Sequence, residues 1–103
     1  MKNKLIFLPS AVDDLDEIIL YIAESDKNEA LKVKNEIIDK IEKLKEFPKL
    51  GRIVSEVKIR KKGYRMLVHE SYLIFYRIIE EKIYIYRILH GKRDYSSLFK
   101  DKF

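Results

Sequence analysis

The fold is decided between residues 64 and 90, where the sequence is YRMLVH (64–69), YLIFYRII (72–79) and KIYIYRILH (82–90). β-Branched and aromatic residues dominate these segments, and short polar pairs separate them, which is typical of strands joined by hairpins. A three-stranded antiparallel meander is therefore predicted. Strict alternation along the third segment predicts two faces, one with Ile83, Ile85, Arg87 and Leu89 and the other with Tyr84, Tyr86, Ile88 and His90.

The chain before the meander predicts a strand followed by a helix. Lys4 to Leu8 is a short apolar run that ends at Pro9, as expected of a strand, because proline cannot donate to the ladder. Ser10 is the expected N-cap of a helix over residues 11–25, with acidic residues in its first turn. Apolar residues at helical spacing form its buried face: Ala11, Leu15, Ile18, Ile19 and Ile22.

A second helix is predicted after the polar break at residues 25–28, ending near Phe47 because Pro48 disfavours helical geometry before it. Its buried stripe consists of Ala30, Val33, Ile37, Ile41 and Leu44. Residues 50–62 are expected to form a loop with some extended structure, and residues 94–99 a short helix or coil. The resulting order is β-α-α-β-β-β. This is an α+β fold with a helical hairpin packed on a mostly antiparallel four-stranded sheet.

Length and composition limit the class of protein. A chain of 103 residues suits one hydrophobic core, so a single domain over residues 1–103 is expected. No apolar run approaches the roughly 20 residues that cross a bilayer, and none fits a signal peptide, so we expect a cytoplasmic protein. The absence of cysteine excludes thiolate ligands, and with two histidines and no clustered acidic residues neither a metal nor a cofactor is expected.

Charge is distributed unevenly along the chain. Residues 1–50 have a net charge of −2 and no arginine, whereas residues 51–103 have a net charge of +7 and all six arginines. Arginine pairs with phosphate and carboxylate groups in bidentate geometry. The basic half therefore indicates an anionic partner, either a nucleic acid or an acidic protein segment. The alternative is a solvated surface whose charge serves only solubility.

Four segments of this sequence resemble the RelE/ParE superfamily of toxins. They are YLIFYRI (72–78), IYRILHGKRD (85–94), the helix pattern around Ala11, Asp14, Leu15 and Ile18, and PKLGR (48–52) with Val54-Ser55-Glu56. The resemblance covers nearly the whole chain. It implies the fold given above and a toxin neutralised by a cognate antitoxin. The antitoxin's acidic C-terminal segment would wrap the toxin in a hetero-oligomer, folding as it binds.

The branches of this superfamily differ in chemistry. RelE-like members cut mRNA on the ribosome with clustered basic side chains and a C-terminal tyrosine, whereas ParE-like members lack that set and inhibit DNA gyrase. Here the turn arginine is kept as Arg93, but Leu73 occupies the strand-arginine position and Phe99 the tyrosine position. Leu73 cannot hold a phosphate, and Phe99 cannot transfer a proton. The pattern favours a gyrase inhibitor, with a ribosome-dependent mRNA endonuclease as the alternative.

The candidate site residues are mostly cationic. Those expected to contact the target or the antitoxin are Arg65, Arg77, Arg87, Lys92 and Arg93. If the chain is a nuclease, the catalytic candidates are Arg65, His90 and Arg93, with His90 as a base near neutral pH. Each has a plainer interpretation. His90 would be a structural hydrogen-bonding residue, and the strand arginines would form ion pairs with Glu56, Glu70 or Glu80.

Overall fold

The computed structural model describes residues 3–55 and 57–91, and a five-stranded sheet lies at its centre. The helices are α1 (Pro9–Ala23), α2 (Lys27–Glu42) with a 3-10 turn at Lys43–Lys45, and α3 (Val57–Lys61). The strands are β1 (Lys4–Phe7), β2 (Arg52–Ile53), β3 (Arg65–His69), β4 (Tyr72–Ile79) and β5 (Lys82–His90). Their order is β1-β5-β4-β3-β2, with β1 parallel to β5 and the other neighbours antiparallel.

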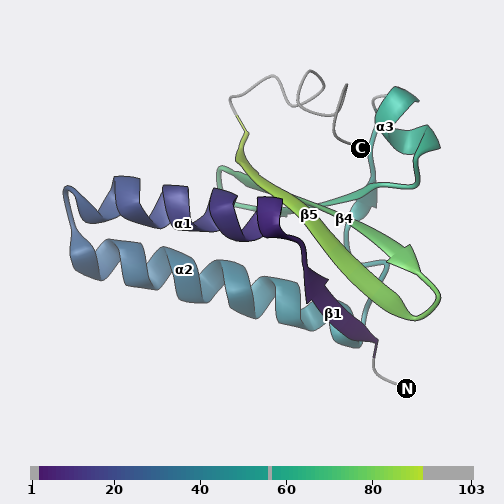
Figure 1. Cartoon of the computed structure of the whole chain (residues 1–103), viewed down its shortest axis with the longest axis horizontal. Coiled ribbons are helices and arrows are strands. Elements are labelled where there is room, and N and C mark those ends of the chain that lie inside the picture. The colour runs from purple at the N-terminus through teal and green to yellow at the C-terminus, as the bar shows by residue number, and fades with distance from the viewer. Residues whose placement is uncertain (1–2, 56, 92–103) are drawn as a thin grey trace.

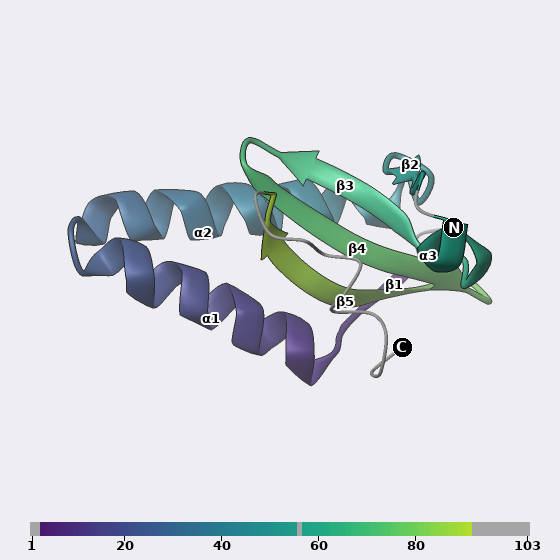
Figure 2. The ribbon, with the colours of Figure 1, turned by 90° about the horizontal axis from the view of Figure 1, so that it is seen from above.

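The α1–α2 hairpin forms the second layer, and its closed end projects beyond the sheet (Figures 1 and 2). The predicted α+β class, the helical hairpin and the meander are confirmed, but the predicted count of four strands is wrong. Residues 50–62 include β2, which is the extended structure expected there, and also α3, a helix that was not expected. β2 has two residues, opposite Arg65 and Met66, which is too short for an alternating pattern to show in the sequence.

The predicted helix boundaries need correction at three ends. α1 begins at Pro9, whose fixed φ suits the first helical position, and Ser10 is not its N-cap. Asp26 does cap α2, since its carboxylate accepts hydrogen bonds from the amides of Asn28 and Glu29. α1 ends at Ala23 and α2 at Glu42, earlier than expected. Among the residues that the structure describes, no helix is long and apolar enough to cross a membrane.

Two hydrophobic clusters lie on opposite faces of the sheet. The larger joins the helices to the sheet and contains Ala11, Leu15, Val33, Ile37, Ile41, Leu44, Leu67, Ile74, Tyr76, Ile83, Ile85 and Ile88. It includes the whole predicted stripe of α2 except Ala30, which is also buried. The smaller cluster is Val54, Ile59, Tyr64, Met66, Phe75 and Leu89. The short helix α3 contributes Ile59, so it covers part of the sheet face that the hairpin leaves open.

A bulge in β5 changes which residues face the helices. Phe75 lies opposite Arg87 and Tyr76 lies opposite Ile85, so Tyr86 is an extra residue in the ladder. The predicted alternation holds for Ile83 and Ile85, which face the helices, and fails after them. Ile88 joins these two in the larger cluster, whereas Leu89 belongs to the smaller one.

Tyr76 fixes the loop before β2 from inside the core. Its hydroxyl donates to the carbonyl of Pro48 at 2.7 Å and accepts from the amide of Gly51 at 2.9 Å. A Cβ at Gly51 would lie 2.6 Å from that hydroxyl, so a larger residue there would displace the tyrosine. The close approach of this loop therefore requires glycine.

The turn between β4 and β5 is strained, and relieving the strain should stabilise the fold. Glu80 and Glu81 have φ values of 49° and 65°, as a type I′ hairpin turn requires of both central residues. Glycine adopts this backbone conformation without steric cost, so Glu81→Gly is expected to raise the free energy of unfolding by about 1 kcal/mol. Urea denaturation would measure the change. Ser71→Gly in the other hairpin is the control, because Ser71 is exposed and lacks a positive φ. Equal stabilisation by both variants would contradict this explanation.

Candidate functional site

A buried ion pair joins α1 to β5. The guanidinium of Arg87 donates to both carboxylate oxygens of Asp14, with Nε–Oδ2 at 2.6 Å and Nη2–Oδ1 at 2.8 Å. The side chains are only 11% and 10% exposed, respectively. The hydrogen bond to Asp14 raises the pKa of Arg87, against the opposite effect of burial. Arg87, expected among the residues that contact the target or the antitoxin, is therefore held within the fold by Asp14, an acidic residue that is not among the three glutamates considered above.

The carboxylate of Asp14 also pairs with a backbone hydrogen-bonding group at the edge of β5. The pairing of β1 with β5 ends at Phe7 and Ile85, so no strand of the described residues lies beside residues 86–90 of β5 on that side. Asp14 Oδ2 accepts a hydrogen bond from the amide of Ile88 at 3.0 Å, and Ser10 Oγ donates to the carbonyl of Tyr86 at 2.7 Å. Side chains of α1 thus replace a strand where a bare edge would invite association.

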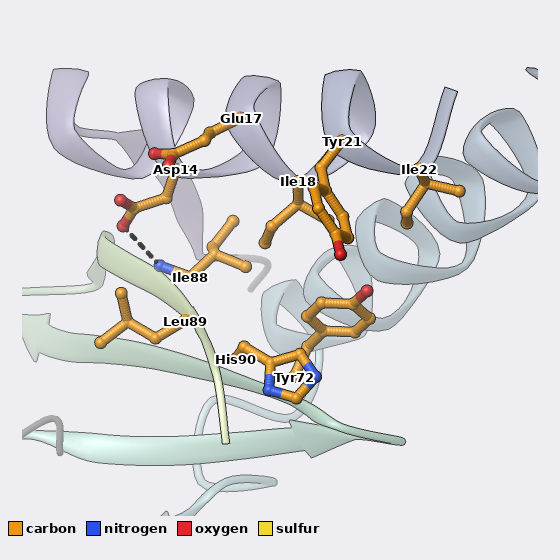
Figure 3. A pocket seen from close by; sticks show the side chains of 9 residues that line it. All are labelled: Asp14, Glu17, Ile18, Tyr21, Ile22, Tyr72, Ile88, Leu89 and His90. Atoms are coloured by element: carbon orange, nitrogen blue, oxygen red, sulfur yellow. Dashed lines mark hydrogen bonds between the residues drawn. The ribbon is translucent and has the colours of Figure 1, made fainter. Parts of the chain in front are cut away.

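A groove lies beside this contact, between α1 and the end of β5. We call it the α1–β5 groove; it has a volume of about 360 Å³ and is lined by Asp14, Glu17, Ile18, Tyr21, Ile22, Tyr72, Ile88, Leu89 and His90. Figure 3 shows Tyr21 pointing from the helix toward Tyr72, with the ring of His90 beside it. The rings of Tyr72 and His90 meet edge to face at 5.6 Å. Burial raises the pKa of Tyr72. A mostly apolar lining with a few polar groups is typical of sites that bind another molecule.

Exposed apolar residues lie near the end of the helical hairpin that projects beyond the sheet (Figure 2). Leu20 and Tyr21 on α1 are 69% and 76% exposed, and Leu31 on α2 is also exposed. We call these three residues the hairpin-tip surface. Tyr21 belongs both to this set and to the lining of the groove. Exposed apolar side chains of this kind are suited to contact with a partner protein.

Two further arginines, both also expected to contact the target or the antitoxin, lie elsewhere on the sheet. Arg65 Nη1 donates to the carbonyl of Gly51 at 2.7 Å. The guanidinium of Arg77 lies over the rings of Tyr64 and Tyr86, 5.5 and 5.9 Å from their centroids. Burial raises the pKa of Tyr64 to about 12. Both arginines therefore contact neighbouring parts of the fold, and within residues 3–55 and 57–91 these contacts are a hydrogen bond and ring contacts.

The two catalytic candidates that the structure describes, Arg65 and His90, lie apart on the sheet. Arg65 lies opposite Tyr76 and His90 lies opposite Tyr72. These tyrosines are four residues apart on β4, about 13 Å along a strand. Lys92 and Arg93, like Glu56 and Phe99, lie outside the described residues. Leu73 is partly buried, pairs with Leu89 and packs against the smaller hydrophobic cluster.

The sequence interpretation missed the role of Asp14, although one signal was present. Asp14 stands between Ala11 and Ile18 on the apolar stripe of α1, where an acidic residue requires a partner. No local pattern identifies that partner, because 73 residues separate Asp14 from Arg87. Tyr21 was missed as well, since a tyrosine at a helix end is not distinctive in the sequence.

Comparison with known proteins identifies similar chains. The family model for the ParE toxin of the type II toxin–antitoxin system parDE matches residues 5–95. The chromosomal ParDE system from P. aeruginosa is 24% identical, with a TM-score of 0.73 over 88% of this chain and 98% of that chain. The toxin–antitoxin complex RelBE2 from Mycobacterium tuberculosis is 17% identical, with a TM-score of 0.65 over 87% and 99%. No curated protein matches the sequence. The two structural likenesses show the fold.

Removing the charge of Asp14 should weaken the fold considerably. Asp14→Asn leaves Arg87 buried without its counter-charge, and loss of one partner of a buried pair costs roughly 3 kcal/mol. Urea denaturation monitored by circular dichroism would measure the loss. Asp13→Asn removes the same charge from an exposed neighbour and should change stability by less than about 0.5 kcal/mol. Similar losses in the two variants would show that the buried pair has no special role.

Proposed function

Because this chain belongs to the family of ParE toxins of type II toxin–antitoxin systems, we propose that it arrests growth by inhibiting DNA gyrase. The observation that carries the proposal is the separation of Arg65 from His90, the two catalytic candidates among the described residues. Gyrase acts in the cytoplasm, and we place the chain there. An mRNA endonuclease acting on the ribosome is the alternative.

Acid–base cleavage of RNA requires several groups within hydrogen-bond reach of one phosphate. Arg65 is held by the carbonyl of Gly51, and His90 lies about four residues further along the sheet, across β4. Leu73, at the position of a nuclease arginine, packs against the smaller hydrophobic cluster. A protein that binds its target needs no such convergence. The arrangement of the described residues therefore favours inhibition by binding.

For the antitoxin, we propose docking at the α1–β5 groove and the hairpin-tip surface. An amphipathic segment can place apolar side chains over Ile18, Ile22 and Leu20 while the exposed hydroxyl of Tyr21 offers a hydrogen bond. Its acidic residues would reach exposed cations of the second half of the chain, which include Arg52 on β2 and Arg60 on α3. Arg87 is not part of this surface, since Asp14 occupies it.

Truncating the groove's exposed tyrosine should weaken antitoxin binding. Tyr21→Ala removes an aromatic anchor, for which a loss of about tenfold or more in affinity is expected. Calorimetry with a peptide from the antitoxin's C-terminal segment would measure the dissociation constant. Val12→Ala is the control, because Val12 is also an exposed apolar residue of α1 but does not line the groove. Equal weakening by the two variants would argue against docking at the groove.

The target can be tested with purified protein. We expect the chain to inhibit supercoiling by gyrase and to leave ribosome-bound mRNA intact. Arg93→Ala should weaken toxicity, while Phe99→Tyr, which restores a nuclease-type hydroxyl, should leave gyrase inhibition unchanged. Leu73→Arg would restore a second nuclease group, but folding must be checked first because an arginine there would be partly buried without a partner. Codon-positioned cleavage of mRNA by the unmodified chain would overturn the proposal.

A further inference from the structure

Three potential metal ligands meet where α2 faces the end of β3. Glu36 comes from α2, His69 is the last residue of β3, and Glu70 follows in the β3–β4 turn. One ligand atom from each lies within 4.8 Å of the other two, and His69 Nε2 is 3.3 Å from Glu36 Oε1. The side chains of His69 and Glu36 are 17% and 35% exposed, so the cluster is sheltered but accessible.

The spacing is close to what a zinc ion needs. Zinc binds histidine nitrogen and carboxylate oxygen at about 2.0–2.2 Å, which places tetrahedral ligands roughly 3.4 Å apart. The His69–Glu36 pair already has this separation. Glu70 is exposed in a turn, so its flexible side chain can close the remaining distance by rotating. A fourth position would be left for water.

We propose that Glu36, His69 and Glu70 form a binding site for a divalent transition-metal ion, with Zn²⁺ as the ion that best fits. An imidazole ligand favours Zn²⁺ over the hard ions Mg²⁺ and Ca²⁺, which prefer all-oxygen sites. The ion ties the turn after β3 to α2, across the interface between the sheet and the helical layer. Since a metal that binds only the folded chain stabilises it by mass action, the melting temperature rises with Zn²⁺ concentration.

The site also adjoins the α1–β5 groove through the sheet. His69 lies opposite Tyr72 in the β3–β4 ladder, and Tyr72 lies opposite His90 in the β4–β5 ladder. A metal ion bound to His69 therefore fixes the end of β3 next to Tyr72, which lines the groove. The metal site itself does not depend on the proposed target or antitoxin, because it rests only on the three ligands and their spacing.

Titration of the chelator-treated chain with Zn²⁺, followed by calorimetry, tests the proposal. One Zn²⁺ should bind per chain. Loss of an outer-sphere partner weakens metal binding by about 10- to 100-fold. Glu36→Gln and His69→Gln each remove a direct ligand, so each should weaken binding by a larger factor. Glu42→Gln removes the same charge from an exposed position on α2 outside the cluster and should leave the affinity unchanged. Binding that neither ligand substitution weakens, or that Mg²⁺ matches, would overturn the site.

A second measurement uses the unmodified chain and so avoids any loss of folding in a variant. The sequence has two histidines, His69 and His90, whose imidazole resonances can be followed separately by nuclear magnetic resonance. Zn²⁺ should shift the resonances of His69 at one equivalent and leave those of His90 in place. A shift confined to His90, or no shift of either at saturation, would refute the proposal.

Discussion

The contact between Asp14 and β5 is the constraint on which the rest of the structure depends. A carboxylate and a guanidinium, each about nine-tenths buried, are stable only if they satisfy each other and their remaining hydrogen-bonding groups. Here the carboxylate of Asp14 also accepts a hydrogen bond from the amide of Ile88. One side chain therefore neutralises a buried charge and pairs with a backbone group at the edge of the sheet. The position of α1 relative to β5 follows from this geometry. The α1–β5 groove then follows, since the helix and strand that form its walls are held at a fixed distance.

The bulge at Tyr86 makes that contact compatible with a continuous core. In a regular strand Arg87 would share a face with Ile85, which is buried among apolar residues against the helices. With one extra residue in the ladder, Arg87 pairs across from Phe75 and its guanidinium reaches Asp14, while Ile88 returns to the helix-facing core. This local irregularity therefore allows β5 to contribute residues to a buried ion pair and to both hydrophobic clusters.

Regular local patterns were predictable from the sequence, and contacts between distant segments were not. The period-two segments gave the meander and the period-3.6 stripes gave the helical hairpin, because each pattern is repeated several times within one element. β2 has two residues and α3 has five, too few for either period to appear. The partner of Asp14 and the meeting of Glu36 with His69 depend on tertiary packing. Motif comparison predicted the ParE-like branch, which the family match supports, but it could not show that the strand arginines serve the fold.

The use of these arginines bears on how a toxin of this kind can act. Arg65, Arg77 and Arg87 hold a loop carbonyl, two tyrosine rings and a carboxylate, so each has a defined role in the folded chain. A phosphoryl-transfer site needs cations that face the substrate together and are otherwise unengaged. A binding protein instead needs a rigid frame that presents an exposed surface, and side chains used to hold that frame contribute to binding indirectly. By this reasoning Arg65, Arg77 and Arg87 contribute mainly by keeping the sheet rigid, and a charged partner would meet cations that remain exposed, such as Arg52 and Arg60.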